Sequence, residues 1–126
     1  MNVVLDASAL LAYLQDEPGG EMIEEILSEA IISSVNWTEV VQKSLAAGVV
    51  IDGMREDLAA LGLEIVPFAS EDGEMAGQLW LQTKQVGLSL GDRACLSLGL
   101  KLNLRVLTCD RIWTTISLAL DVQVIR

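Results

Sequence analysis

The sequence has no histidine and only two cysteines, Cys95 and Cys109, in 126 residues. The missing imidazole excludes Ser-His and Cys-His nucleophiles, histidine general acid–base catalysis and His-ligated zinc. Two cysteines are too few for a disulfide framework or a four-cysteine zinc site, so we expect two buried free thiols in a reducing compartment. Any metal chemistry in this chain must therefore use oxygen ligands.

Basic residues are also scarce, with 8 Lys and Arg against 18 Asp and Glu and a net charge of -10. This balance argues against a nucleic-acid binder that works through a basic surface, because phosphate contacts need Lys and Arg. It does not exclude a nuclease that reaches phosphates through bound cations. The chain also lacks an apolar run of membrane-spanning length and a signal peptide, which predicts a cytoplasmic protein with no membrane partner.

Aromatic residues make up only 4% of a chain that is 52% hydrophobic, so the core must be built from Leu, Ile, Val and Ala. The length is most simply that of one domain, and no linker, repeat or low-complexity tract divides residues 1–126. We therefore predict a single folded unit.

Short apolar segments alternate with amphipathic ones along the whole chain. This order is typical of right-handed βαβ units, and it predicts a three-layer α/β/α sandwich around a mainly parallel five-stranded sheet. We expect Ser34 or Asn36, and Ser70, to cap two of the helices. The predicted strands are 3–5, 31–33, 63–67, 104–108 and 122–125. The main predicted helices start near residue 10 or cover 21–30, 34–47, 49–61, 70–85 and about 90–103.

Four acidic residues stand at the end of a predicted strand or the start of a predicted helix. Each has a simple structural interpretation: two are helix caps, one completes a capping box with Ser89, and one is a surface partner of Lys43 four residues on. As a set they are hard oxygen ligands, which suit Mg²⁺ or Mn²⁺ and the metal-assisted hydrolysis of phosphate esters. Ligands of open α/β sheets bind outside the carboxyl ends of the strands, where these acids would lie. The four are Asp6, Glu39, Asp92 and Asp110.

Four stretches carry a resemblance to a known family: VLDASALLAYL, SSVNWTEVVQKSLAAG, GLSLGDRACLSLGLKL and VLTCDRIW. In this order and spacing the chain resembles the PIN-domain ribonucleases, especially the VapC-type toxins of type II toxin–antitoxin pairs. The resemblance implies an Mg²⁺- or Mn²⁺-dependent endoribonuclease, the strand order 3-2-1-4-5, an antitoxin protein as partner and a homodimer. It implies that Asp6, Glu39, Asp92 and Asp110 are the catalytic, metal-binding acids and that Ser8 and Thr108 line the same site. Arg93 and Trp113 fall on family-like positions without an assigned role.

Two alternatives remain open. The first is a phosphoacceptor receiver domain, with Asp52 after Val49-Val50-Ile51 as the acceptor, although the residues that follow are more typical of a helix start. The second is a non-catalytic PIN scaffold that only binds a protein partner. The complete set of four acids favours the enzyme, because clustered carboxylates repel one another in the absence of a cation.

Overall fold

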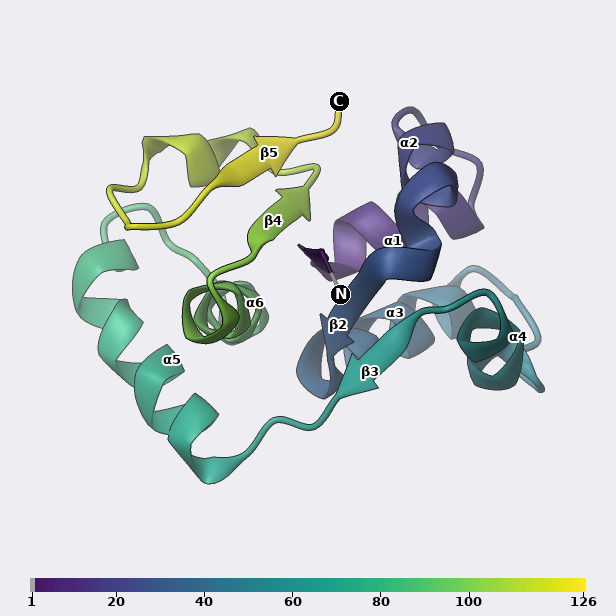
Figure 1. Cartoon of the computed structure of the whole chain (residues 1–126), viewed down its shortest axis with the longest axis horizontal. Coiled ribbons are helices and arrows are strands. Elements are labelled where there is room, and N and C mark those ends of the chain that lie inside the picture. Colours follow the sequence, from purple (N-terminus) through teal and green to yellow (C-terminus); the bar gives the residue numbers. More distant parts are fainter. Residues whose placement is uncertain (1) are drawn as a thin grey trace.

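The computed structural model describes residues 2–126, and a five-stranded parallel sheet runs through its centre (Figure 1). Its strands lie in the order β3-β2-β1-β4-β5, and each neighbouring pair is parallel. This confirms the predicted sheet and agrees with the strand order that the resemblance implied. The strands are β1 (Val3–Leu5), β2 (Ala30–Ser33), β3 (Glu64–Val66), β4 (Arg105–Thr108) and β5 (Val122–Val124).

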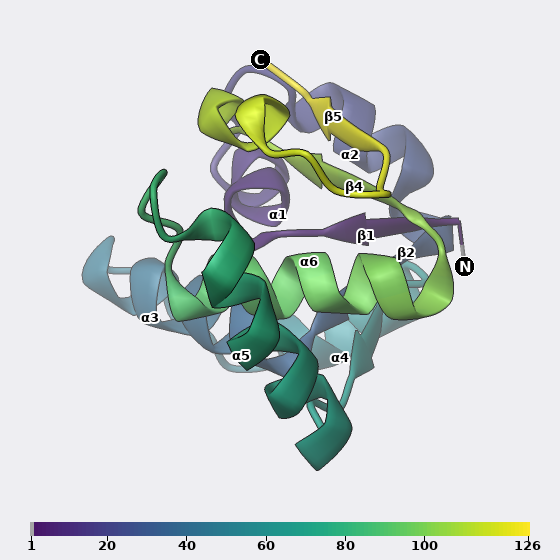
Figure 2. The same ribbon diagram turned by 90° about the vertical axis from the view of Figure 1, so that its left-hand side faces the viewer.

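Helices cover both faces of the sheet, so the predicted three-layer sandwich is confirmed. In Figure 1, α5 and α6 lie on the left of the strands and α1, α2, α3 and α4 on the right; Figure 2 shows the face that α5 and α6 cover. No helix within residues 2–126 is long and apolar enough to cross a membrane. The helices are α1 (Ala7–Leu14), α2 (Gly20–Ile26), α3 (Ser34–Ala46), α4 (Met54–Ala60), α5 (Ser70–Thr83) and α6 (Leu90–Leu102), with 3₁₀ turns η1 (Leu27–Glu29) and η2 (Arg111–Thr115).

Alternate residues of the central strand β1 belong to different hydrophobic clusters. Val3 and Leu5 pack with residues of α1 to α4, whereas Val4 packs with residues of α5, α6 and η2. All three side chains are almost fully buried, as expected for the middle strand of a parallel sheet covered on both faces. The residue that follows β1 is therefore held by a strand that is fixed on all sides.

The predicted helix over 49–61 is wrong in its first part, because α4 begins only at Met54. Gly48 and Gly53 both have positive φ, +79° and +78°, so the backbone leaves the helical conformation at these two points. Val49-Val50-Ile51 forms no strand either. Asp52 therefore does not follow a strand, which removes the structural basis of the receiver alternative.

Two predicted helix caps are also wrong by one to three positions. Ser33, rather than Ser34 or Asn36, caps α3, with its hydroxyl accepting from the N–H of Val35 at 3.2 Å. Ala69, rather than Ser70, is the N-cap of α5, and its N–H donates to the carboxylate of Asp72 at 2.8 Å. The helix expected over 21–30 is α2 followed by the 3₁₀ turn η1. These shifts leave the order of the elements unchanged.

Candidate metal centre

Asp6 stands at the carboxyl end of β1, and its side chain is tied into both neighbouring elements. Oδ1 accepts hydrogen bonds from the N–H of Ala9 at 2.8 Å and from the hydroxyl of Ser8 at 2.7 Å. Oδ2 accepts from the hydroxyl of Thr108, at the end of β4, at 2.5 Å. The bond to Ala9 makes Asp6 the N-cap of α1, so the helix-cap interpretation is correct. The residue is only 5% exposed.

The hydroxyls of Ser8 and Thr108 join the ends of β1 and β4. Each donates to Asp6 and also accepts a backbone N–H, from Cys109 at 2.9 Å and from Asp110 at 3.1 Å respectively. These four bonds fix the Asp6 carboxylate relative to the loop that carries Asp110. The structure thus places the hydroxyls of Ser8 and Thr108 beside Asp6.

Asp92 and Asp110 also bond to the backbone at the start of a helical turn. Asp92 Oδ2 accepts from the N–H of Ser89 at 2.9 Å, while the Ser89 hydroxyl accepts from the N–H of Asp92 at 3.1 Å, which completes the expected capping box. Asp110 Oδ1 accepts from the N–H of Ile112 at 3.1 Å. Each of these bonds uses one carboxylate oxygen and leaves the second without a helix-capping role.

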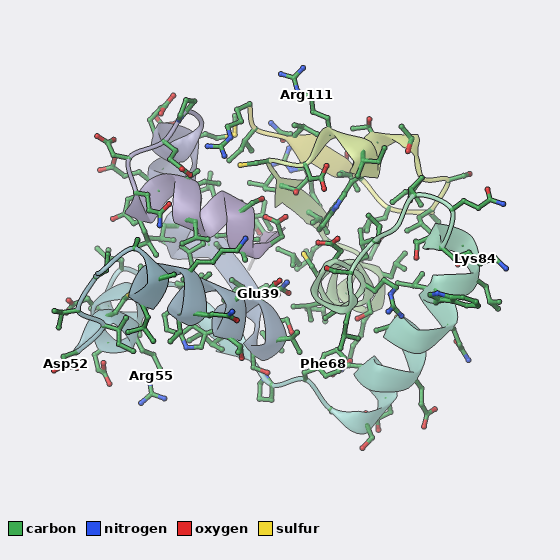
Figure 3. All side chains as sticks on the ribbon, turned by 180° about the vertical axis from the view of Figure 1, so that it is seen from behind. Glu39, Asp52, Arg55, Phe68, Lys84 and Arg111 are labelled. Atoms are coloured by element: carbon green, nitrogen blue, oxygen red, sulfur yellow. The ribbon has the colours of Figure 1, made fainter. Side chains whose placement is uncertain are left out.

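Glu39, on α3, points toward the centre of the molecule (Figure 3). Its Oε1 accepts a hydrogen bond from Asn36 Nδ2 at 2.9 Å, and the same nitrogen donates to the carbonyl oxygen of Gly91 at 2.9 Å. The expected surface pair with Lys43 does not form. The ion pairs within residues 2–126 are Arg55–Glu56, Lys101–Asp72 and Arg126–Glu17.

All four predicted acids line one pocket of about 160 Å³. They reach it from the end of β1, from α3, from the start of α6 and from the loop after β4. The remaining lining residues include a single base, Lys43. A carboxylate can therefore cap a helix and also line the pocket, since three of the four do both. The pocket is lined by Asp6, Ala7, Ser8, Asn36, Glu39, Lys43, Asp92 and Asp110.

Burial is the main electrostatic influence on Asp6. It raises the pKa of the carboxyl group from 3.8 to about 6, against the hydrogen bonds from Thr108, Ser8 and the N–H of Ala9, which lower it. The negative charge of Asp92 adds a smaller increase. Asp6 is therefore a buried acid whose hydrogen bonds do not fully replace the water it has lost.

Cys95 is fully buried under this group of acids, and burial raises the pKa of its thiol. The charges of Asp6, Asp92 and Glu39 raise the pKa of Cys95 further, because all three lie near the same sulfur atom. Cys109 is also a free thiol but is only partly buried, so the expectation of two buried free thiols is fully met only at Cys95.

The donor set of the pocket fits a hard divalent cation. No three Asp, Glu or Cys side chains of residues 2–126 are arranged so that they could hold a metal ion as they stand. Mg²⁺, however, usually keeps several waters and binds proteins through one or two carboxylates rather than through a complete protein cage. A pocket of about 160 Å³ leaves room for an ion that keeps part of its water. Four carboxylate groups without competing nitrogen or sulfur ligands suit Mg²⁺ or Mn²⁺.

The family model of the PIN domain matches residues 3–117 of this chain. The chain therefore belongs to the PIN domain family, which confirms the resemblance drawn from the sequence.

Solved structures with the same fold include chains of toxin–antitoxin complexes. A chain of the VapBC2 complex of Rickettsia felis, bound to a promoter DNA fragment, superposes with a TM-score of 0.70 at 17% identity, covering 98% of each chain. A Klebsiella pneumoniae toxin–antitoxin complex gives 0.69 at 18% identity, over 86% of this chain and 87% of that one. The structure of FitAcB from Neisseria gonorrhoeae gives a TM-score of 0.68 at 16% identity, over 95% of each chain. No curated protein matched in the comparison of sequences.

Two pocket residues, Asn36 and Lys43, and the neighbouring Gly91 were not expected as part of the site from the sequence. Asn36 was considered only as a helix cap and Lys43 only as a surface partner of Glu39, while Gly91 was not singled out. Positions 36, 39 and 43 are three and four residues apart on one helix, so this spacing was a usable signal for Asn36 and Lys43. The contact of Gly91 depends on the packing of α3 against α6, which no local pattern shows.

Proposed function

We propose that this chain is a metal-dependent endoribonuclease and the toxin of a type II toxin–antitoxin pair. The observation that carries the proposal is the convergence of Asp6, Glu39, Asp92 and Asp110 on one pocket. This pocket lies at the carboxyl ends of the central strands β1 and β4 of a PIN-family sheet. PIN domains are in general divalent-metal-dependent nucleases. The absence of histidine supports the same chemistry, since carboxylates are then the groups left to hold a cation.

The four acids would hold Mg²⁺ or Mn²⁺, which when bound supplies charge neutralisation at the phosphate and activation of water. Ser8 and Thr108 hold the Asp6 carboxylate in one orientation through their hydroxyl groups. Lys43, the single base at the pocket, offers an ammonium group to the phosphate backbone of the RNA. These roles divide the site between cation binding and substrate contact.

Water is the nucleophile in this mechanism, so the cleaved RNA should carry 5′-phosphate and 3′-hydroxyl ends. The experiment that tests the proposal incubates structured and unstructured RNA with the protein in Mg²⁺, in Mn²⁺ and in excess chelator. Cleavage should require the metal and should stop in chelator. Products ending in a 2′,3′-cyclic phosphate would contradict the mechanism, because the RNA 2′-hydroxyl would then be the nucleophile.

A matched pair of acid variants controls this assay. Asp110→Asn removes one carboxylate from the pocket, whereas Asp52→Asn removes an exposed one that lies away from Glu39 beside α4 (Figure 3). Asp110→Asn should lose cleavage and Asp52→Asn should keep it. A wild-type protein that binds the metal but leaves every RNA intact would instead support the non-catalytic PIN scaffold.

We further propose an antitoxin protein as partner and a homodimer as the assembly, acting in the cytoplasm on cellular RNA. The support is that the fold is shared with a chain of a toxin–antitoxin complex and with a member of the VapBC family of toxin–antitoxin systems from Mycobacterium tuberculosis. Expression of the chain alone should arrest growth, and co-expression with the product of a neighbouring antitoxin gene should relieve the arrest. Sedimentation at micromolar concentration should show a dimer; a monomer without any growth effect would contradict this part of the proposal.

A further inference from the structure

Asn36 is a buried amide located between α3 and α6. It is 1% exposed, and its Nδ2 makes both of its hydrogen bonds to acceptors, Glu39 Oε1 and the Gly91 carbonyl, each at 2.9 Å. Because neither acceptor can donate, the NH₂ group must face them, and the orientation of the amide is fixed. Its Oδ1 is then buried without a hydrogen-bond partner among residues 2–126, which is unfavourable for stability.

Gly91 also lies against the Glu39 carboxylate. A Cβ atom built at this position would stand 2.7 Å from both carboxylate oxygens of Glu39, which is closer than atoms can approach. The missing side chain therefore makes the room that Glu39 occupies. Gly91 is in the first turn of α6, next to Asp92, so this contact also sets where Glu39 lies relative to Asp92.

We propose that Asn36 and Gly91 are positioning residues that hold the Glu39 carboxylate in place for the cation. This inference rests on the metal-binding role assigned to Glu39 in the proposed function. Asn36 connects Glu39 Oε1 to the backbone of α6, and Gly91 lets that backbone approach. Glu39 Oε2, which accepts no hydrogen bond within residues 2–126, stays free to bind the cation.

The unsatisfied Oδ1 of Asn36 is consistent with this role. An apolar side chain of similar size at position 36 would fill the space between α3 and α6 without burying an unpaired carbonyl group. What it would not do is donate to a Glu side chain, whose rotatable bonds leave the carboxylate free to move when nothing holds it. The amide of Asn36 thus lowers the stability of the fold through its unpaired Oδ1, but it fixes the direction of the Glu39 side chain.

Binding of Mn²⁺, measured from the electron paramagnetic resonance signal of the free ion, tests the proposal without RNA. Asn36→Leu and Gly91→Ala should each weaken Mn²⁺ binding about tenfold to a hundredfold, the usual effect of removing a group that orients a metal ligand. Gly77→Ala is the matched control for Gly91→Ala. Gly77 is an exposed helical position of α5 where an added Cβ meets nothing within 4 Å. Its Mn²⁺ affinity should equal that of the wild type.

The Glu39→Gln background separates positioning from general damage to the fold. If Asn36 and Gly91 act through Glu39, Asn36→Leu and Gly91→Ala should change the Mn²⁺ affinity of Glu39→Gln less than twofold. Folding of Gly91→Ala is favoured by the higher helix propensity of Ala, so this arm remains informative even if Asn36→Leu does not fold.

Three outcomes would overturn the proposal: wild-type Mn²⁺ affinity in Gly91→Ala, full additivity with Glu39→Gln, or no Mn²⁺ binding by the wild type. The last outcome would also remove the metal-dependent nuclease. A wild type that binds Mn²⁺ with the expected coupling but cleaves no RNA would remove only the enzyme and would support the positioning roles.

Discussion

Asp6 and Asp72 are two aspartates with almost the same exposed fraction and a similar hydrogen bond at a helix start, but their pKa values are shifted in opposite directions. They are 5% and 6% exposed, and each accepts a backbone N–H at the start of a helix, from Ala9 and from Ala69. Burial raises the pKa of Asp6 to about 6. The pKa of Asp72 is lowered, first by the N–H of Ala69 and then by Lys101, against the effect of burial.

The two sites differ first in depth, because burial is the largest influence on the pKa of Asp6, whereas at Asp72 the hydrogen bond from the N–H of Ala69 outweighs it. They differ second in the nearest positive charge. Lys101 Nζ lies 3.1 Å from Asp72 Oδ1 and forms an ion pair with it. Asp6 receives only neutral donors, and the charge that affects its pKa is the negative one of Asp92. Asp72 thus has its counterion within the chain, whereas Asp6 is placed for a counterion from solution. Deep burial without a positive charge nearby is the physical argument for a cation at Asp6.

The largest expected effect is the difference in RNA cleavage rate between variants that remove the charge of Asp6 and of Asp72. Asp6→Asn should lower RNA cleavage in Mg²⁺ by about 10³-fold, since charge stabilisation by a bound metal is worth several kcal/mol. Asp72→Asn should leave the cleavage rate of the folded protein within about twofold, because its partner Lys101 does not line the pocket. Initial rates at saturating RNA, normalised to the folded fraction, measure this. Equal losses in both variants would end the distinction between a functional and a structural aspartate.

The pH dependence of stability should show the second largest effect. Because the pKa of Asp6 rises from 3.8 to about 6 on folding, the folded chain holds this proton more tightly than the unfolded chain. Stability from Asp6 is therefore fully present below pH 3.8 and is lost as the pH rises through 6. A shift of this size corresponds to about 3 kcal/mol.

Denaturant unfolding of metal-free wild type and Asp6→Asn, from pH 4 to pH 7.5, isolates this contribution. Asp6→Asn should gain stability relative to the wild type as the pH rises, because it has no charge to bury. Added Mg²⁺ should reduce the gap at pH 7.5 by stabilising only the wild type. A difference between the two proteins that is constant across the pH range would show that Asp6 has an ordinary pKa.

Asp92 tests whether a capping residue can also belong to the cation site. The wild type at a Mg²⁺ concentration 100 times its Kd should gain about 2.7 kcal/mol, and Asp92→Asn should lose most of that gain. Without metal, loss of the charge at the α6 N-terminus costs about 0.3–1 kcal/mol, offset by relief of repulsion with Asp6. Thermal melts with and without Mg²⁺ measure both terms. The same Mg²⁺ response in both proteins would leave Asp92 as a cap alone.

The sequence was sufficient to predict the order of the strands and helices and the positions of the four acids, because both have local sequence patterns. Strand–helix alternation predicts the parallel sheet, and each acid is at a strand end or helix start that composition reveals. Helix starts were less predictable, since α4 depends on the positive φ of Gly53 and α5 begins at Ala69, which has no capping side chain. The contacts of Asn36 and Gly91 could not be predicted, because they join positions 55 residues apart across two packed helices.

The smallest expected effect belongs to the ion pair of Asp72. Lys101 is 45% exposed in its side chain, so solvent screens the pair, and Lys101→Gln should cost less than about 1 kcal/mol at pH 7. Since the pKa of Asp72 is lowered on folding, its stabilisation is present above pH 3.8 and is lost as the pH falls through the folded value. Lys101→Gln should therefore be less stable than the wild type at pH 7 and equally stable in acid. This trend is opposite to that of Asp6→Asn, which gains stability relative to the wild type as the pH rises.

The N–H of Ala69 remains in Lys101→Gln and keeps part of the pKa shift of Asp72, because it is the larger cause. Mg²⁺ should stabilise Lys101→Gln as much as the wild type, and a reduced Mg²⁺ response would mean that the two aspartates are not independent.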